Sequence, residues 1–109
     1  MQTTIDLVEV LSNCLKNKKG YTITASGEIT ERPFDGKFYD IKKIKVDCNF
    51  DYIELVRLPG GIIMIADEEG LLRSKQYNPI ASIIYQEGYN DKSLGIVGDV
   101  VICHTSRVN

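Results

Sequence analysis

The 109-residue chain has no tryptophan, one histidine, three prolines and three cysteines. No stretch approaches the ~20 apolar residues that cross a bilayer, which excludes a membrane span. The cysteines are odd in number and far apart, which argues against a secreted disulfide framework, and the first residues lack the basic start and apolar stretch of a secretory signal. We therefore expect a cytoplasmic protein with no membrane partner and with buried, unreactive thiols at Cys14, Cys48 and Cys103.

Neither the net charge nor the spacing of the glycines favours a nucleic-acid-binding protein or a glycine-rich phosphate-binding loop. Thirteen basic and fifteen acidic residues give a net charge of −2, whereas nucleic-acid binders are mostly basic. The glycines form no GxGxxG or GxxxxGK pattern, so the phosphate-binding fingerprints are absent. What is present, 43% apolar and 26% charged residues, is typical of one soluble domain spanning 1–109.

Two segments have helical spacing of their apolar residues. Residues 4–17 predict an amphipathic helix that covers a sheet, and Asn78-Pro79 is a typical start for a short second helix that ends near Gly88. The predicted buried positions are Ile5, Val8, Leu11 and Leu15 in the first helix and Ile80, Ile83 and Ile84 in the second.

Between and after these helices the pattern favours strands. Residues 21–25 and 28–31 predict a hairpin, strict alternation over 43–48 predicts a strand with one solvated face, and 52–58 with 62–66 predict a second hairpin. The unbroken apolar run at 62–66 indicates a strand covered on both faces, and a last strand is expected at 96–103. The predicted fold class is α+β: an antiparallel sheet of five to six strands, with the N-terminal helix and the short second helix packed on one face.

The acidic turn Asp67-Glu68-Glu69 is a candidate for a magnesium site. Successive turn residues point in different directions, while Mg²⁺ ligands converge from separate positions. We therefore expect a solvated turn, no metal and no cofactor. A small metal-dependent hydrolase using Asp67, Glu68 and Asp99 is the weakest of three functional hypotheses.

His104 follows Cys103, but neighbouring residues of a strand face opposite sides of the sheet. A Cys/His nucleophile needs an adjacent, oriented partner, and zinc needs about four convergent ligands. Neither site is expected, and the chain is predicted not to be an enzyme.

Loop aromatics and scattered basic residues are the features that suggest binding. Aromatic side chains in loops commonly anchor interfaces. Lys43 and Lys45 on one predicted strand, with Arg57 on its expected neighbour, would form a modest basic patch that suits phosphate or an acidic surface. The aromatic candidates are Phe34, Phe38, Tyr39, Tyr77 and Tyr89, and the basic candidates are Lys43, Lys45, Arg57, Arg73 and Lys75.

Residues 50–103 resemble a family of domains of unknown function, DUF3846. The resemblance is carried by 52–61 (YIELVRLPGG), 65–72 (IADEEGLL), Asn78-Pro79 and 96–102 (IVGDVVI). The family places a helix directly before its "yIEvv" strand, where a strand is predicted here at 43–48. The resemblance implies a phage or mobile-element origin and transfers no site residue.

The leading hypothesis is a small non-enzymatic binding protein that neutralises a host defence protein by direct contact. The alternative is a sponge that sequesters a nucleotide messenger, with basic residues on the phosphate, a tyrosine on the base and the site at an interface of a homo-oligomer.

Overall fold

The computed structural model describes residues 7–33, 36–70 and 75–108. Its strands form one antiparallel five-stranded sheet in the order β2-β1-β5-β4-β3, which confirms the predicted α+β class. The elements are α1 (Leu7–Lys16), β1 (Gly20–Ile23), β2 (Ile29–Arg32), α2 (Ile41–Cys48), β3 (Ile53–Leu58), β4 (Ile62–Asp67), α3 (Pro79–Tyr89), β5 (Val100–His104) and the 3₁₀ helix η1 (Thr105–Arg107).

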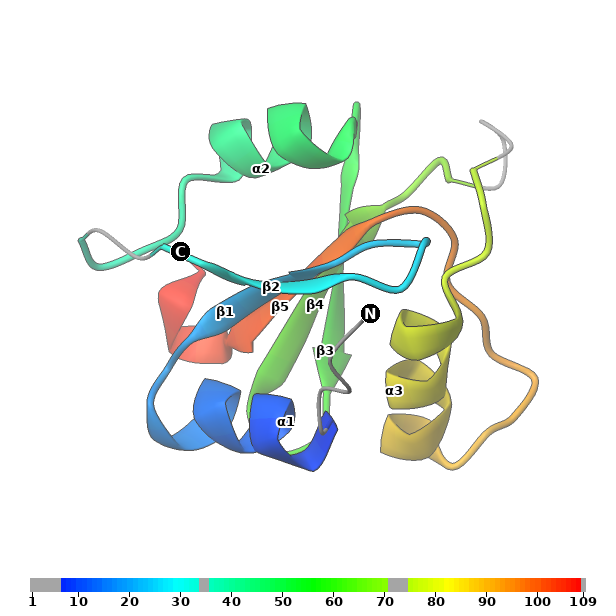
Figure 1. Cartoon of the computed structure of the whole chain (residues 1–109), viewed down its shortest axis with the longest axis horizontal. Helices are drawn as coiled ribbons and strands as arrows, with labels where there is room; N and C mark the ends of the chain where they lie inside the picture. The colour runs from blue at the N-terminus through cyan, green and yellow to red at the C-terminus, as the bar shows by residue number, and fades with distance from the viewer. Residues whose placement is uncertain (1–6, 34–35, 71–74, 109) are drawn as a thin grey trace.

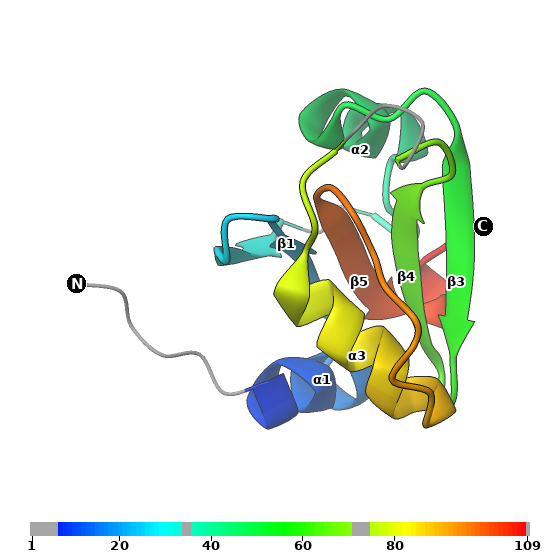
Figure 2. The ribbon, with the colours of Figure 1, turned by 90° about the vertical axis from the view of Figure 1, so that its right-hand side faces the viewer.

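Helices cover both faces of the sheet (Figures 1 and 2). One core lies under α1 and α3 and includes Met64 and Ile102, while α2 packs on the other face above Ile63 and Val101. The prediction that the N-terminal helix and the Asn78-Pro79 helix share one face is confirmed. The third helix, α2, was not predicted.

The predicted strand at 43–48 is wrong, because these residues form α2. Asp40 caps the helix start by accepting bonds from the amides of Lys42 and Lys43 at 3.0 and 3.4 Å, as N-cap aspartates do. Asn49 ends it in the left-handed conformation, at φ 58°. The buried residues Ile44 and Cys48 are four apart and so share one helical face, a spacing that strict alternation also contains.

The β3–β4 hairpin is confirmed, in the register Ile53↔Asp67 to Leu58↔Ile62. All six residues of β4 are buried, as expected for a strand covered on both faces. The β1–β2 hairpin is confirmed as well, pairing Gly20↔Arg32 to Ile23↔Ile29.

The last strand begins at Val100, four residues later than predicted. Residues 96–98 run beside 76–78 instead, where Asn78 N donates to Ile96 O at 2.9 Å and Gly98 N donates to Gln76 O at 2.7 Å. Asn78 is fully buried there. Its Oδ1 accepts from Ala81 N, and its Nδ2 donates to Ile23 O and Gly98 O. This one side-chain amide therefore joins α3, β1 and the segment that leads into β5.

Candidate binding surface

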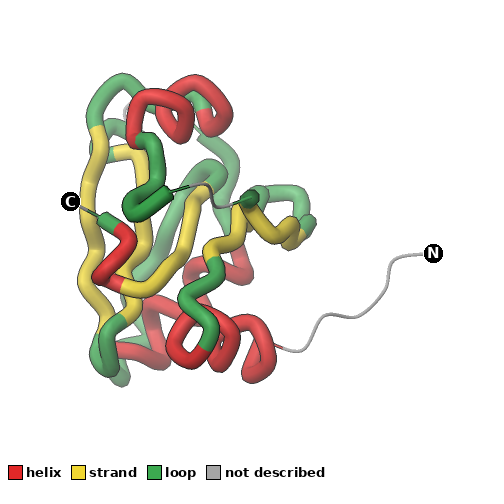
Figure 3. The backbone as a smooth tube through the Cα atoms, turned by 90° about the vertical axis from the view of Figure 1, so that its left-hand side faces the viewer, coloured by secondary structure: helices red, strands yellow, loops and turns green. Residues whose placement is uncertain are grey.

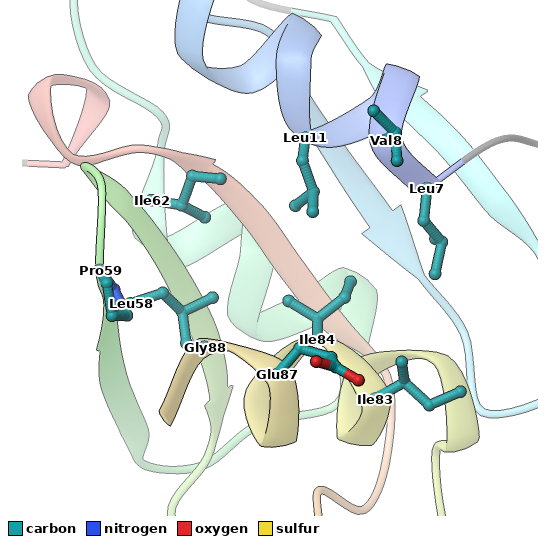
Figure 4. Close-up of a pocket in the computed structure, with 10 residues that line it drawn as sticks. All are labelled: Leu7, Val8, Leu11, Leu58, Pro59, Ile62, Ile83, Ile84, Glu87 and Gly88. Atoms are coloured by element: carbon teal, nitrogen blue, oxygen red, sulfur yellow. The ribbon is translucent and has the colours of Figure 1, made fainter. Parts of the chain in front are cut away.

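An apolar groove lies between α1, α3 and the β3–β4 turn, and we refer to it as the α1–α3 groove (Figure 4). Its volume is about 320 Å³. Helix α1 forms one wall, α3 the other, and the end of β3 with the start of β4 closes one end. The lining residues are Leu7, Val8, Leu11, Leu58, Pro59, Ile62, Ile83, Ile84, Glu87 and Gly88.

Two aliphatic side chains on the walls of this groove are exposed. Val8 on α1 is 73% exposed and Ile83 on α3 is 48% exposed. Both were predicted to be buried, and both predictions are wrong. Helix α1 turns Val10 and Cys14 toward the sheet, so the stripe that includes Val8, Leu11 and Leu15 lies beside the core; Leu15 is also exposed.

The exposure of Ile83 on α3 also arises because other residues of the helix face the core. The residues that α3 buries are Ala81, Ser82 and Ile84, and Ser82 Oγ satisfies the backbone of Ile96 by accepting from its N–H at 2.8 Å. A small polar residue thus takes a core position that the sequence pattern assigned to an isoleucine. The groove was not predicted because the apolar residues of its walls have the helical spacing of buried core residues.

The eight predicted binding residues that the structure describes do not form one site. Phe34 and Arg73 lie outside the described residues. Lys43 and Lys45 lie on α2, Arg57 on β3, Tyr77 precedes α3, and Phe38 is exposed beside Lys37, whose Nζ lies 5.4 Å from its ring centre. The prediction that Lys43 and Lys45 share a strand next to Arg57 fails with the strand itself.

Tyr39 is buried rather than exposed. Burial is the main cause that raises the pKa of its hydroxyl. Its ring packs against Gly20, where an added Cβ would lie 2.4 Å from the hydroxyl oxygen. Tyr39 therefore belongs to the core under α2 and offers no surface for a partner.

Lys75 is a structural residue. Its Nζ lies 2.7 Å from Oδ2 of the buried Asp67, donates to Asn49 O at 2.6 Å, and sits 4.9 Å from the centre of the Phe50 ring. These contacts fasten the C-terminal end of α2 to the end of β4. Lys75, which was predicted to bind phosphate, is thus paired with Asp67, which was predicted for a hydrolase site.

Tyr89 and Arg57, two of the predicted binding residues, are in contact with each other. The Tyr89 hydroxyl, on the last turn of α3, donates to the backbone carbonyl of Arg57. The ring of Tyr89 also contacts Tyr85 edge-on, with the centroids 5.7 Å apart. The contact therefore anchors α3 to β3 and leaves half of the Tyr89 surface exposed.

The remaining polar candidates serve the fold. Asp99 Oδ1 accepts from Ala25 N at 2.9 Å and so holds the β1–β2 turn. His104 Nδ1 accepts from Ser106 N at the start of η1. Cys103 lies in the core under α2, so it and His104 form no Cys/His pair, as predicted. In the part of the chain that the structure describes, no three Cys, His, Asp or Glu side chains gather as metal ligands.

The three thiols are buried and unbonded to one another, as predicted. Burial raises the pKa of Cys14 and of Cys103 to about 12 and that of Cys48 to about 11. The thiolate is the nucleophile in cysteine chemistry, so these side chains are unsuited to catalysis near neutral pH.

No helix in the described ranges is both long and apolar enough to cross a membrane. Searches of protein families, curated proteins and solved structures find no match to this chain. The resemblance to DUF3846 thus stays a prediction, although α2 now stands directly before the Tyr52–Leu58 stretch, where that family pattern has a helix.

Proposed function

We propose that this chain is a non-enzymatic binding protein whose α1–α3 groove holds the apolar side chains of a partner protein. The observation that carries the proposal is the exposure of Val8 and Ile83 on the two walls of an apolar groove. Exposed apolar side chains around a concavity mark interaction sites, whereas single scattered ones need no explanation.

The shape and charge of the groove favour an amphipathic helix as the ligand. Two helices form its walls and Leu58 and Ile62 lie at its closed end, a setting in which a helix presents apolar residues three or four positions apart. Glu87 is the charged residue of the lining. A lysine or arginine beside the apolar residues of the partner helix would pair with it.

The resemblance of residues 50–103 to DUF3846 supports the biological side of the proposal. It suggests a phage or mobile-element protein that acts in the cytoplasm of a bacterial host and neutralises a host defence protein by occupying it. The described geometry gives the nucleotide sponge less support. Lys43 and Lys45 share α2, whereas Arg57 lies on β3 with its carbonyl bonded to Tyr89 and Lys75 is paired with Asp67.

Capture from host lysate followed by affinity measurement tests the proposal. The tagged chain should retain one host protein in stoichiometric amount, and Val8→Lys should raise the dissociation constant of the purified pair at least about tenfold, since losing one buried aliphatic side chain costs ~1.5 kcal/mol. Val46→Lys is the matched control, because Val46 is 80% exposed and lies on α2.

Equal retention by the Val8→Lys and Val46→Lys variants would place the contact elsewhere. A chain that retains no protein, and melts at a higher temperature in the presence of a nucleotide, would replace this proposal with the sponge.

A further inference from the structure

Within the described ranges, the outer edge of β3 has no strand partner, and the Tyr89 hydroxyl bonds to it at the Arg57 carbonyl. β3 is the last strand of the sheet and pairs with β4 alone, and its free side runs along the border of the molecule (Figures 2 and 3). An edge strand presents unpaired N–H and C=O groups that template pairing with another strand.

The hydrogen bonds of the hairpin show which residues face outward. Tyr52 O accepts from Glu68 N at 3.0 Å, so Tyr52 points its backbone groups toward β4. Because these directions alternate along an antiparallel strand, Ile53, Leu55 and Arg57 point theirs to the free side. The bond from Tyr89 to the Arg57 carbonyl agrees with this assignment.

Three large exposed side chains gather along the same edge. Leu55 is 40% exposed in the middle of β3, Tyr52 is 61% exposed before its start, and Tyr89 is 50% exposed beside its end. Leu55 lies next to Ile65 in the hairpin register. An added strand would therefore extend an existing apolar row.

We propose that a second copy of this chain pairs with β3 in antiparallel fashion, about a two-fold axis through Leu55. Only outward-pointing residues can exchange hydrogen bonds across the edge. Pairing these outward-pointing residues about the axis sets Leu55 opposite the partner's Leu55 and Ile53 opposite the partner's Arg57. The edge is self-complementary, as a two-fold interface requires.

The charges and aromatic rings fit the same register. Arg57 lies diagonal to the partner's Asp51, within the reach of a long side chain, and symmetry repeats the pair. Tyr52 lies opposite the partner's Leu58, beside the partner's Tyr89. The Arg57 carbonyl has two lone pairs, so it can accept the new strand bond and keep its bond from Tyr89.

The dimer would hold a continuous ten-stranded sheet. A two-fold axis perpendicular to the sheet keeps α1 and α3 of both copies on one face, so the two α1–α3 grooves would open on the same side. This inference does not depend on the proposed function. Leu58 belongs to both the groove lining and β3, but the outward-pointing residues Ile53, Leu55 and Arg57 do not line the groove.

Sedimentation velocity of the full chain tests the pairing. The wild-type protein should sediment with twice the 12.2 kDa mass of one chain, and Leu55→Lys should sediment with the mass of one, since it sets two like charges directly opposite each other. Val46→Lys is the matched control and should stay dimeric, and Val8→Lys, which alters only the groove, should stay dimeric too.

A charge exchange tests the register. Arg57→Asp should weaken the dimer, and the double variant Arg57→Asp, Asp51→Arg should restore its dissociation constant to within about threefold of wild type, which is less than 1 kcal/mol. A wild-type chain that remains monomeric at about 100 µM, or a Leu55→Lys variant that remains dimeric with native circular dichroism, would overturn the proposal. Partner capture through the groove would be unaffected by either result.

Discussion

Asn78 should be among the most costly residues of the chain to truncate. In Asn78→Ala the carbonyls of Ile23 and Gly98 lose their donor at a fully buried position, and the amide of Ala81 loses its cap. An orphaned buried polar group costs ~1–3 kcal/mol and a lost N-cap costs about 1 kcal/mol. The free energy of unfolding should therefore fall by about 3–7 kcal/mol, a large part of the ~5–15 kcal/mol typical of a domain.

Urea unfolding followed by far-ultraviolet circular dichroism measures this loss, since the chain has no tryptophan to report it. With a slope of about 1.5 kcal/mol per molar urea, a loss of ~3 kcal/mol lowers the midpoint by roughly 2 M. Asn17→Ala is the matched control: Asn17 is exposed, and its Nδ2 donates to Asn13 Oδ1 at the surface, so its change should stay within about 0.5 kcal/mol. A loss below about 1 kcal/mol for Asn78→Ala would refute the structural role assigned to this amide.

Two further predictions concern the buried ion pair and the thiols. Lys75→Met removes the cation beside the buried Asp67 carboxylate and should lower the free energy of unfolding by about 3–5 kcal/mol; adding Asp67→Asn should recover part of it, and additive losses in a double-mutant cycle would contradict the pairing. Cys14, Cys48 and Cys103 should resist Ellman's reagent at about pH 8 in the native protein and react once it is unfolded. Because burial raises their folded pKa values to about 12, 11 and 12 from 9.0, stability should hold below about pH 9 and fall above it, as the unfolded chain releases protons first; urea midpoints that stay constant up to pH 10 would contradict this.

Much of the sheet could be predicted because its turns carry their own chemistry. Pro59-Gly60-Gly61 sets the β3–β4 hairpin, where Gly60 and Gly61 adopt φ of 92° and 101°, values that glycine adopts without strain. Helix α2 was missed because Ile44 and Cys48 satisfy both the alternation of a strand and the four-residue step of a helix. The caps at Asp40 and Asn49 were the signals that separate the two.

The candidate surface could not be predicted, since periodicity shows that a stripe is apolar but does not show what covers it. In α1 the sheet takes Val10 and Cys14 and leaves Val8 to the groove. The same limit applies to Lys75, whose partners Asp67 and Asn49 come from elements distant in sequence. Long-range pairing of that kind leaves no mark on the local pattern.

The position of β5 has a consequence for how the molecule assembles. Of the described strands, β5 comes last in sequence but lies in the middle of the sheet. It pairs with β1 on one side and with β4 on the other, and so joins the two hairpins. Each hairpin closes a short loop and can form early, but joining them requires contacts across most of the chain, the slow kind of step in folding. A chain that stops short of Val100 would carry two unjoined hairpins with exposed inner edges, and addition of β5 covers both of those edges at once.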